Sequence, residues 1–430
     1  MLPRAYAGAC LHLLLVLLTC WGFQAAQSKP VDEARLLLQI KSMWGDPPVL
    51  TAWNASASAA HCRWPYVRCN KAGRVSGLYL AAANVSGPFL EAIASLSRLK
   101  HLDLRNNRIA GVFPTSLYSC RSLEYLDLSM NHFVGELPAD IGLGLSANLT
   151  QLYLGNNRFN GTIQASLSRL RNLRFLKLQD NLFVGTIPAE LGDLTSLQEL
   201  YLGYNPFDAG ELPRSFRKLA SLSVLAVWDS NLVGDFPSFL VGMRELKALA
   251  LFNNSLTGSI PPGIWRLNKL QDLYLSRNNL TGHLVDDGFA AMSLKYIDLG
   301  HNQLSGMLPD FVGLLENLAI LSLPNNNFTG KIPASIARLP SLMVLWLDNN
   351  RFNGTLPPEL GKHSLDLANV SVDNNELTGA IPEGLCNGGN LDSFSTSSNR
   401  LNGSIPVGLA NCASLQTLRL DSNQLSGQVP

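Results

Sequence analysis

The chain has 430 residues, a formal net charge of +1 and only 15% charged residues. A protein that binds nucleic acid through electrostatics would carry an excess of Lys and Arg, so this balance argues against that class. Hydrophobic residues make up 46% of the chain, enough for a sizeable core, and the 35 Gly and 23 Pro are spread along it, which excludes a collagen-like or low-complexity chain.

The first residues have the pattern of a secretory signal peptide. Arg4 supplies a positive start, residues 11–23 are apolar, and small residues near Ala26 offer a cleavage site. A membrane anchor is the alternative, but the apolar run is short for the roughly 20 residues that span a bilayer. We predict that residues 1–26 are a signal peptide, that the chain enters the secretory pathway, and that no later stretch spans a membrane.

Residues 27–74 form a candidate N-terminal cap with two closely spaced cysteines. Cys62 and Cys69 lie seven positions apart, and in an oxidising compartment such a pair favours a disulfide that closes a short loop. A zinc site is the alternative, but only His61 lies nearby and no second cysteine pair accompanies it. We therefore predict a disulfide.

From residue 75 to residue 430 the sequence repeats itself about every 24 residues. Successive copies follow the pattern L-x-x-L-x-L-x-x-N-x-L/F-x-G-x-I/L-P, as in residues 99–114, 246–261 and 318–333. We count fifteen units, the sixth with one extra residue. A period of this length with these residues indicates a leucine-rich-repeat solenoid.

The pattern predicts an α/β solenoid, a right-handed superhelix of about 24-residue repeats. The alternation in L-x-L predicts a short strand with its leucines facing inward, and the strands of successive units would stack in parallel on the concave face. Turns and 3-10 segments would lie on the convex face, because the repeat Gly permits a tight turn and the Pro after it excludes a regular central strand.

The Asn of each unit, as in Asn107 and Asn131, is expected to turn into the core and to bond the backbone of adjacent turns. Ala83 in the first unit and Ser230 in the seventh replace it, and of these two only the serine keeps a hydrogen-bonding group. The last unit ends at Pro430 without a paired-cysteine cap, so we expect a truncated array.

Three cysteines lie within the repeats. Cys386 and Cys412 are one repeat apart and either form a disulfide or remain separate buried thiols. Cys120 occupies the position in its unit that Cys412 occupies later, and we interpret it as a small buried hydrophobic residue.

The repeat form L-x-G-x-I-P is similar to that of plant extracellular leucine-rich-repeat proteins. The stretch VDEARLLLQIKSMW, Trp53 and CRWPYVRC resemble the N-terminal cap of that family, with Tyr66 where Gly is usual. Residues 357–391 and 398–420 resemble the ectodomains of the HAESA-like receptor kinases, which sense secreted peptides.

This resemblance implies the ectodomain of a plant receptor-like kinase, without its membrane span and kinase. It would bind a secreted peptide and then recruit a leucine-rich-repeat co-receptor kinase at the extracellular side of the plasma membrane. HAESA-like receptors carry Arg-x-Arg on a late strand to hold a peptide carboxylate, and the matching positions here are Thr417 and Arg419. A single Arg would therefore remain as the anchor, unless it pairs with Asp421 instead.

Catalysis has no support in the sequence. The seven His are scattered without a metal-binding spacing, and neither a phosphate-binding glycine loop before a helix nor a GxSxG motif is present. We therefore predict a non-enzymatic chain without a metal site or cofactor.

Large aromatic side chains recur beside the paired leucines, at positions that point out of the predicted sheet. Strands favour aromatic residues in general, but a long exposed apolar stripe is typical of a binding surface, and aromatics are common anchors. Asp103, Arg105, Tyr125 and Asp127 begin this face. We predict that the ligand-binding residues are Tyr153, Phe175, Lys177, Tyr201, Trp228, Phe252, Tyr274, Tyr296, Asp298, Trp346, Asp348 and Arg419.

Ten Asn-x-Ser/Thr sequons fit a secreted glycoprotein. They are Asn54, Asn84, Asn148, Asn160, Asn253, Asn279, Asn327, Asn353, Asn369 and Asn402. Most follow the predicted strand, where a sugar would spare the concave face. Asn369 is the exception, because the register places it on that face, so either it is unmodified or the ligand does not reach the thirteenth unit.

Two other functions remain open at this point. The chain could be a secreted defence or inhibitor protein that binds another protein, located outside the cell or in the cell wall. It could also be a wall or scaffold protein without a signalling role. The resembling inhibitors are shorter and end in their own cap.

Overall fold

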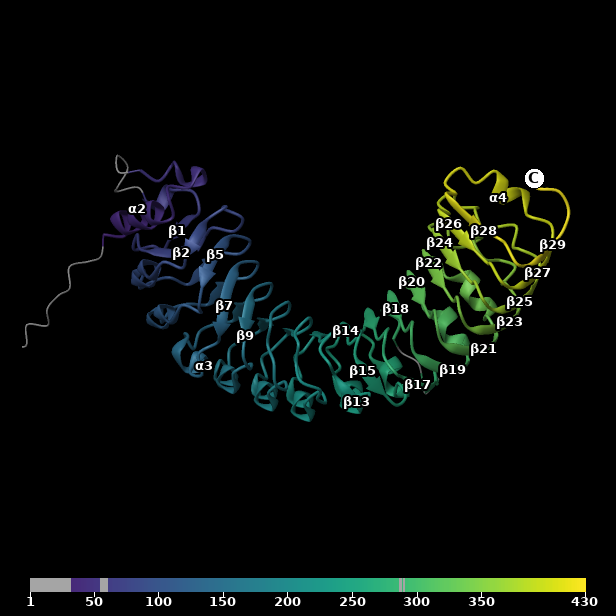
Figure 1. Ribbon diagram of the computed structural model, residues 1–430, viewed down its shortest axis with the longest axis horizontal. Coiled ribbons are helices and arrows are strands. Elements are labelled where there is room, and N and C mark those ends of the chain that lie inside the picture. Colours follow the sequence, from purple (N-terminus) through teal and green to yellow (C-terminus); the bar gives the residue numbers. More distant parts are fainter. Residues whose placement is uncertain (1–31, 55–60, 286–287, 289–290) are drawn as a thin grey trace, which may run out of the picture.

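The computed structural model describes residues 32–54, 61–285, 288 and 291–430, so the predicted signal peptide, residues 1–26, lies outside the described residues. The chain forms one long arc with strands along its inner face (Figure 1). None of the described helices is both long and apolar enough to cross a membrane.

The inner face of the arc is a single 16-stranded sheet. Strand β1 is antiparallel to β2, and every later neighbour pair in this sheet is parallel. In most strands the middle residue is a buried aliphatic side chain, and the residues on either side of it face outward. The strands are β1 (Val67–Cys69), β2 (Val75–Tyr79), β4 (His101–Asp103), β6 (Tyr125–Asp127), β8 (Gln151–Tyr153), β10 (Phe175–Lys177), β11 (Glu199–Tyr201), β12 (Val224–Ala226), β14 (Ala248–Ala250), β16 (Asp272–Tyr274), β18 (Tyr296–Asp298), β20 (Ile320–Ser322), β22 (Val344–Trp346), β24 (Asn369–Ser371), β26 (Ser393–Ser395) and β28 (Thr417–Arg419).

We number the units by these strands, from β2 in unit 1 to β28 in unit 15. The convex side carries short helices, most of them 3-10, which are packed unit against unit. They are η3 (Glu91–Ser95), η4 (Thr115–Ser119), α3 (Ile141–Gly144), η5 (Ala165–Arg169), η6 (Ala189–Asp193), η7 (Arg214–Lys218), η8 (Ser238–Gly242), η9 (Pro262–Arg266), η10 (Asp310–Leu314), η11 (Ala334–Arg338) and α4 (Val407–Ala410). The predicted solenoid, with parallel strands on the concave face and 3-10 helices on the convex face, is confirmed.

The repeated Asn holds neighbouring units together. In unit 10 the Asn302 side-chain oxygen accepts the backbone N–H of Leu280 at 3.0 Å, and its nitrogen donates to the carbonyls of Leu275 and Leu299, both at 3.0 Å. The same bonds recur from Asn107 onward, so the predicted role of this residue in the core matches the structure. Each buried amide satisfies backbone groups of two successive units that would otherwise lack a partner.

A second set of strands follows this Asn in most units, and the sequence did not predict it. These strands form flanking sheets of four, two and seven strands on one side of the arc. They end before the repeat Pro, whose ring would interrupt the ladder. The strands are β3 (Ser86–Pro88), β5 (Arg108–Gly111), β7 (His132–Glu136), β9 (Arg158–Asn160), β13 (Val233–Asp235), β15 (Ser255–Thr257), β17 (Thr281–His283), β19 (Gln303–Met307), β21 (Asn327–Lys331), β23 (Arg351–Thr355), β25 (Glu376–Gly379), β27 (Arg400–Gly403) and β29 (Gln424–Leu425).

The repeat Gly has two reasons to be glycine. Gly330 has a φ of +77°, a region that side-chain-bearing residues rarely adopt. A Cβ on it would also lie 2.8 Å from Cγ of Met307, which belongs to the preceding unit. Gly354 repeats the arrangement against Lys331, at 2.9 Å. The side chain after one Gly therefore lies over the Gly of the next unit.

Units 6 and 7 interrupt this regularity, and we call their boundary the joint. Ser230 takes the place of the Asn, and its hydroxyl donates only to the carbonyl of Trp228, at 2.8 Å. Unit 6 carries the extra residue, and the flanking sheet is broken between β9 and β13. A hollow of about 730 Å³ opens beside the joint, with Arg217, Asp235 and Phe239 among its lining residues.

The N-terminal cap closes the first turn of the solenoid. Helix α2 (Glu33–Met43) begins after Asp32, whose carboxylate accepts the N–H of Arg35, and η1 (Pro48–Leu50) follows. The buried Glu33 carboxylate binds Arg74 Nε and the N–H of Val75, both at 2.7 Å. The ion pair and the backbone bond fix the helix against the first strands.

Candidate functional site: the concave face

We define the concave face as the two outward residues of each inner strand plus the residue two positions after the strand. All twelve predicted ligand-binding residues lie on this face. Trp228, Phe252 and Asp348 follow β12, β14 and β22, and the other nine lie within strands. Their contact with a ligand stays a prediction.

The middle of the face is an aromatic and apolar floor. The ring of Trp228 stacks on Phe252 at 5.8 Å and meets the edge of Tyr201 at 6.4 Å. Next to these rings the register aligns Ala226 with Ala250, so small side chains leave a shallow strip beside large ones. A flat apolar strip bordered by rings suits an extended chain with apolar side groups.

Lys177 is the cation at the start of this floor. Its Nζ lies 4.2 Å from the ring centroid of Tyr201 and 5.5 Å from that of Tyr153. The same amine is 3.1 Å from the Glu199 carboxylate. Burial and the nearby Glu199 raise the pKa of Tyr153 to about 12. Lys177 is therefore held between two rings and one carboxylate.

The aromatic surface extends further toward the cap than the sequence indicated. Tyr79 stacks on His101 at 4.2 Å, and His101 stacks on Tyr125 at 3.9 Å. The guanidinium of Arg68 lies 5.6 Å from the Tyr79 centroid. Tyr79 and His101 were missed, although they occupy the same repeat positions as the predicted aromatics.

Two carboxylates lie on the same strands as these rings, Asp103 on β4 and Asp127 on β6. Asp103 and Asp127 are nearly fully buried, and burial raises the pKa of both. The Asp127 carboxylate accepts hydrogen bonds from the hydroxyls of Ser129 and Tyr125. Burial also lowers the pKa of His101, an effect that Asp127 partly opposes. The carboxylates at the N-terminal end of the face are therefore largely removed from solvent.

The C-terminal end of the face is more polar. Trp346 is 40% exposed, between Ser322 and Ser371 on the neighbouring strands. Thr417 and Arg419 are exposed on β28. Arg419 forms no ion pair with Asp421 in the described structure. That carboxylate accepts the Ser397 hydroxyl at 2.6 Å, and this bond together with the charge of Arg419 lowers the pKa of Asp421. Arg419 is thus available to a ligand.

The sequons lie mainly away from the concave face. Nine of them are exposed, and Asn160, Asn327, Asn353 and Asn402 lie on the flanking strands β9, β21, β23 and β27. Asn369 is half-buried in β24, with Val344 and Ser393 as its neighbours in register. It lies on the concave sheet, as the repeat register indicated, and glycosylation of all ten stays a prediction.

The predicted Cys62–Cys69 disulfide is present, and Cys386 and Cys412, for which the sequence left two possibilities, also form a disulfide. Cys62 and Cys69 are joined with a Cα–Cα distance of 5.4 Å, and Cys386 and Cys412 with one of 5.9 Å. Cys120 is free and buried, and burial raises the pKa of its thiol to about 11. Its role as a small hydrophobic residue agrees with this environment.

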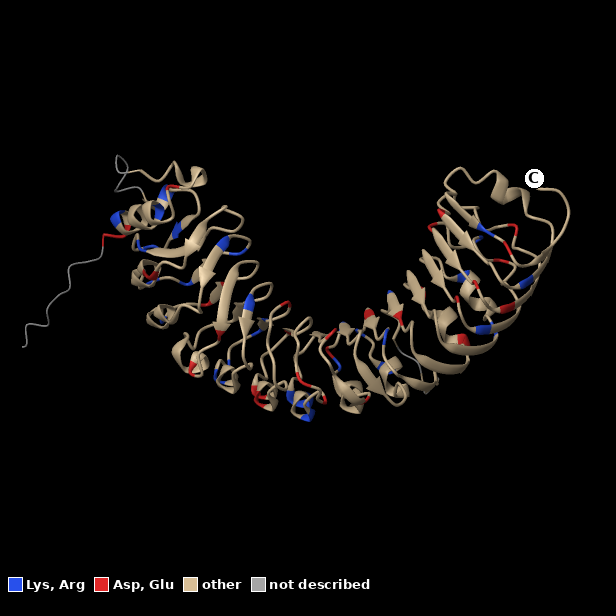
Figure 2. Ribbon diagram, in the orientation of Figure 1, with Lys and Arg blue, Asp and Glu red and all other residues tan. Residues whose placement is uncertain are grey.

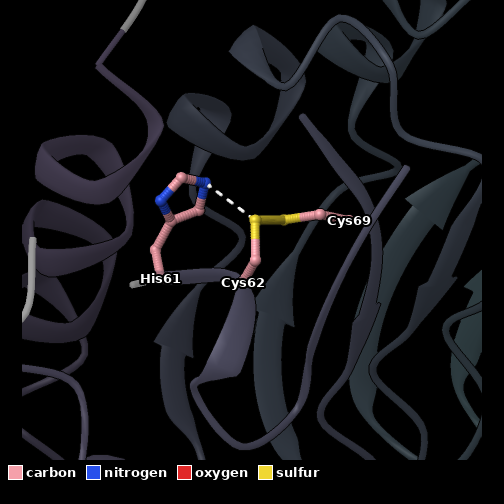
Figure 3. Close-up of side chains that lie close together, drawn as sticks. All are labelled: His61, Cys62 and Cys69. Carbon is pink, nitrogen blue, oxygen red and sulfur yellow. Dashed lines mark hydrogen bonds between the residues drawn. A yellow bond between two sulfur atoms is a disulfide. The ribbon is translucent and has the colours of Figure 1, made fainter. Parts of the chain in front are cut away.

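One group among the described residues has the composition of a metal site: His61, Cys62 and Cys69. Figure 3 shows that the two sulfur atoms are bonded to each other and that His61 Nε2 lies 3.5 Å from Cys62 Sγ. No thiolate is available for a metal while the disulfide is intact. The group therefore belongs to the structure of the cap.

Family profiles match both parts of the chain. The profile "Leucine rich repeat" matches residues 75–133, 147–207, 220–280 and 292–352, which together cover more than half of the chain. The profile "Leucine rich repeat N-terminal domain" matches residues 31–70.

Solved structures of plant receptors have the same fold. The Arabidopsis receptor kinase HAESA, in complex with the peptide hormone IDA and the co-receptor SERK1, is 36% identical with a TM-score of 0.89, over 93% of this chain and 67% of that chain. HAESA with an extended IDA peptide is also 36% identical, with a TM-score of 0.87, over 92% and 66%.

Curated relatives match over shorter stretches. Receptor-like protein kinase HSL1 of Arabidopsis thaliana is 39% identical over 78 residues, 18% of this chain and 8% of its own length. Polygalacturonase inhibitor 1 of Oryza sativa subsp. japonica is 37% identical over 93 residues, 21% of this chain and 27% of its own length. The alignments thus span well under a third of these relatives. The chain belongs to the leucine-rich-repeat family, is homologous to plant receptor kinases of that family, and matches the HAESA ectodomain in structure.

Proposed function

We propose that the chain is the extracellular ligand-recognition part of a plant receptor-like kinase and that it binds a secreted peptide on its concave face for cell-surface signalling. The row of aromatic side chains on the concave face, one in each unit from Tyr153 to Tyr296, is the observation that carries the proposal. The described HAESA structures contain a peptide hormone, and so do those of PEPR1 with AtPEP1 and of RGFR1 with RGF2. These likenesses support a peptide rather than a small molecule.

The dimensions support the same ligand class. Nine units at about 4.8 Å each span roughly 40 Å along the sheet. An extended peptide rises about 3.3 Å per residue, so about twelve residues would cover that length. A small molecule would contact only a few of the rings.

In the proposed mechanism the peptide first lies along the face, and the occupied surface then recruits a co-receptor kinase, as the presence of SERK1 in the HAESA complex suggests for this chain. The parent protein would be a Ser/Thr kinase at the plasma membrane, with this domain outside the cell. Signalling would follow from pairing of the two ectodomains, so this chain itself would carry out no reaction.

An inhibitor of a wall-degrading enzyme is the second candidate, favoured by the likeness to polygalacturonase inhibitor 1. The sequence of the transcript beyond the codon of Pro430 would distinguish the receptor from the inhibitor. A reading frame that continues beyond the codon of Pro430 into an apolar span and a kinase supports the receptor, and one that ends in a cap of its own supports the inhibitor.

A direct test uses peptides selected from a random dodecapeptide display library on the purified, glycosylated chain. We expect Trp228→Ala and Trp346→Ala each to weaken the selected peptides by 30-fold or more in titration calorimetry, because buried aromatic anchors carry most of a binding energy. Leu143→Ala, which removes an exposed apolar side chain on the convex helix α3, is the matched control. Unchanged affinity in both Trp variants would exclude the assigned face.

A further inference from the structure

Charge is unevenly compensated along the concave face. From unit 9 onward five carboxylates occupy it, and Arg419 is the single cation at the equivalent positions. The five are Asp272, Asp298, Asp348, Asp373 and Asp421. Among the residues that the structure describes, none of these carboxylates forms an ion pair. In Figure 2 acidic segments mark the inner side of the C-terminal half of the arc.

In the first six units, by contrast, the carboxylates on the concave face are paired with cations or buried. The carboxylate of Asp103 is 3.6 Å from Arg105, and that of Glu199 is 3.1 Å from Lys177. Asp127 has no cation but is buried and bonded to hydroxyls. Negative charge on this side is therefore paired or removed from solvent, and it offers little to a ligand.

Neutral groups hold the C-terminal carboxylates in place. Asp298 accepts the N–H of Gly300 at 3.2 Å and the hydroxyl of Ser322 at 2.9 Å. Asp373 accepts the hydroxyl of Ser395 at 2.7 Å. Such donors orient a carboxylate without neutralising it, so its full charge stays directed at the face.

The surroundings reduce this charge only in part. Burial raises the pKa of Asp272, and Lys295, directly before β18, opposes that shift, although the two form no ion pair in the described structure. Asp392, directly before β26, adds another acid at the rim. The whole chain has a net charge of only +1, so the acidity is local to this surface. A concave surface of one sign concentrates its field and attracts opposite charge.

The exposed ring of Trp346 is a second, independent indication that this part of the face binds a cationic group. Its ring is 40% exposed, lies in register between Ser322 and Ser371, two residues before Asp348, and has no ring partner within the described chain. An exposed indole next to carboxylates is suited to an ammonium or guanidinium group, which gains from both the ring face and the negative charge.

We propose that the peptide ligand is cationic and that its Lys or Arg side chains lie over units 9–12, with its apolar part on the aromatic floor of units 4–9. This inference rests on the proposed function and specifies its ligand class. The acids and Trp346 would select for positive charge, while Lys177 and the paired acids of the earlier units would contribute little to that selection.

The dodecapeptide library provides the test. We expect the selected peptides to contain more Lys and Arg than the unselected library, and their affinity to fall as NaCl rises from 50 to 500 mM, because salt screens exposed ion pairs. Binders without such an excess would overturn the cationic ligand and leave peptide binding intact. A library that yields no binder would overturn the proposed function itself.

Charge variants locate the effect. The triple variant Asp272→Asn, Asp298→Asn and Asp348→Asn should weaken the selected peptides roughly tenfold, since each screened pair contributes a factor of about two to five. The control neutralises three exposed acids away from the face: Asp310→Asn, Glu316→Gln and Glu383→Gln. Equal affinities in the two triple variants would overturn the proposal.

Discussion

The regular units 9–15 and the joint between units 6 and 7 are built from the same repeat but differ in how neighbouring units are tied together. In the regular stretch every unit has its Asn, and one continuous flanking sheet runs from β17 to β29. At the joint the Asn is missing and the flanking sheet is broken, yet Leu200 and Leu225 still align in the inner sheet. The leucine core therefore sets the stacking, whereas the flanking sheet is interrupted even where Asn181 and Asn205 make their regular bonds.

The bonds around the joint show how the loss is tolerated. Asn254 of unit 8 accepts the N–H groups of both Ser230 and Leu232, at 3.1 and 2.9 Å. Asn231 donates to the carbonyl of Phe207 at 3.2 Å. Of these bonds, only that of Asn231 to Phe207 crosses from unit 7 to unit 6 and replaces part of the missing connection, so we expect local opening to be easiest at the joint.

The largest effect should come from removing an Asn in the regular stretch. Asn302→Ala leaves the buried N–H of Leu280 without its partner and removes the bonds to two carbonyls, at a cost of about 2–4 kcal/mol in local unfolding free energy. Hydrogen exchange of amides in units 9 and 10 measures this. Ser230→Ala at the joint should cost less than about 1.5 kcal/mol, because one hydroxyl bond is lost. Equal costs would contradict the distinction between the regions.

The next effect concerns the repeat Gly. Gly330→Ala places a Cβ at positive φ and against Met307, so we expect a loss of about 1–3 kcal/mol in urea denaturation. At the joint, Gly210 has an ordinary φ and its nearest neighbour is Thr186 at 3.3 Å. Gly210→Ala should therefore be milder. The comparison fails if the joint variant is the less stable of the two.

Restoring the missing residue should strengthen the joint. Ser230→Asn would supply an amide able to bond the backbone of unit 6, for a gain of about 1 kcal/mol. Slower hydrogen exchange around Phe207, with an unchanged rate in unit 12, is the expected result. Ser230 is 1% exposed. Faster hydrogen exchange around Phe207 in the Asn variant would show that the larger side chain does not fit at this position.

The smallest effect concerns a buried acid on the N-terminal side of the joint, Asp127. Burial raises the pKa of Asp127, so the folded state binds that proton more tightly than the unfolded state does. The resulting stability is present below the ordinary Asp value and is lost as pH rises through the raised pKa. Asp127→Asn, which cannot ionise, should therefore increase Tm more at pH 7 than at pH 4. A gain of the same size at both pH values would rule out this cause.

Much of the fold was predictable because its signal recurs in every unit. The period, the inward leucines and the Asn hydrogen bonds follow from spacing alone. The flanking strands were missed because segments such as Gln303–Met307 place polar residues and a Gly before a Pro, a composition that does not favour a strand in isolation. They form because the neighbouring units supply partners at a fixed spacing.

The sequence predicted that the candidate site lies on the concave face, but not how far the aromatic surface extends or which of its acids are paired. The aromatic residues from Tyr153 to Trp346 follow from the repeat register. Tyr79 and His101 were missed although Asp103, on the same strand as His101, was already placed on this face. The difference between paired and unpaired acids depends on distances such as that from Lys177 to Glu199, which no spacing rule provides.

Tyr66 departs from the resembling family and shows what that family's Gly provides. Its φ is +67°, the region that favours glycine, and its ring packs partly against the core. The cap therefore keeps the backbone turn and accepts local strain in exchange for apolar contact.

The contact between each repeat Gly and the preceding unit also bears on how such arrays evolve. Val112, Glu136, Thr162 and Lys331 differ in size, charge and polarity, yet each lies over a glycine of the next unit. A bare backbone accepts any of them, so the two positions need not change together. Copies duplicated or exchanged by recombination can therefore adjoin new neighbours without a compensating substitution at this contact, and arrays can lengthen or reshuffle while the surface residues diversify.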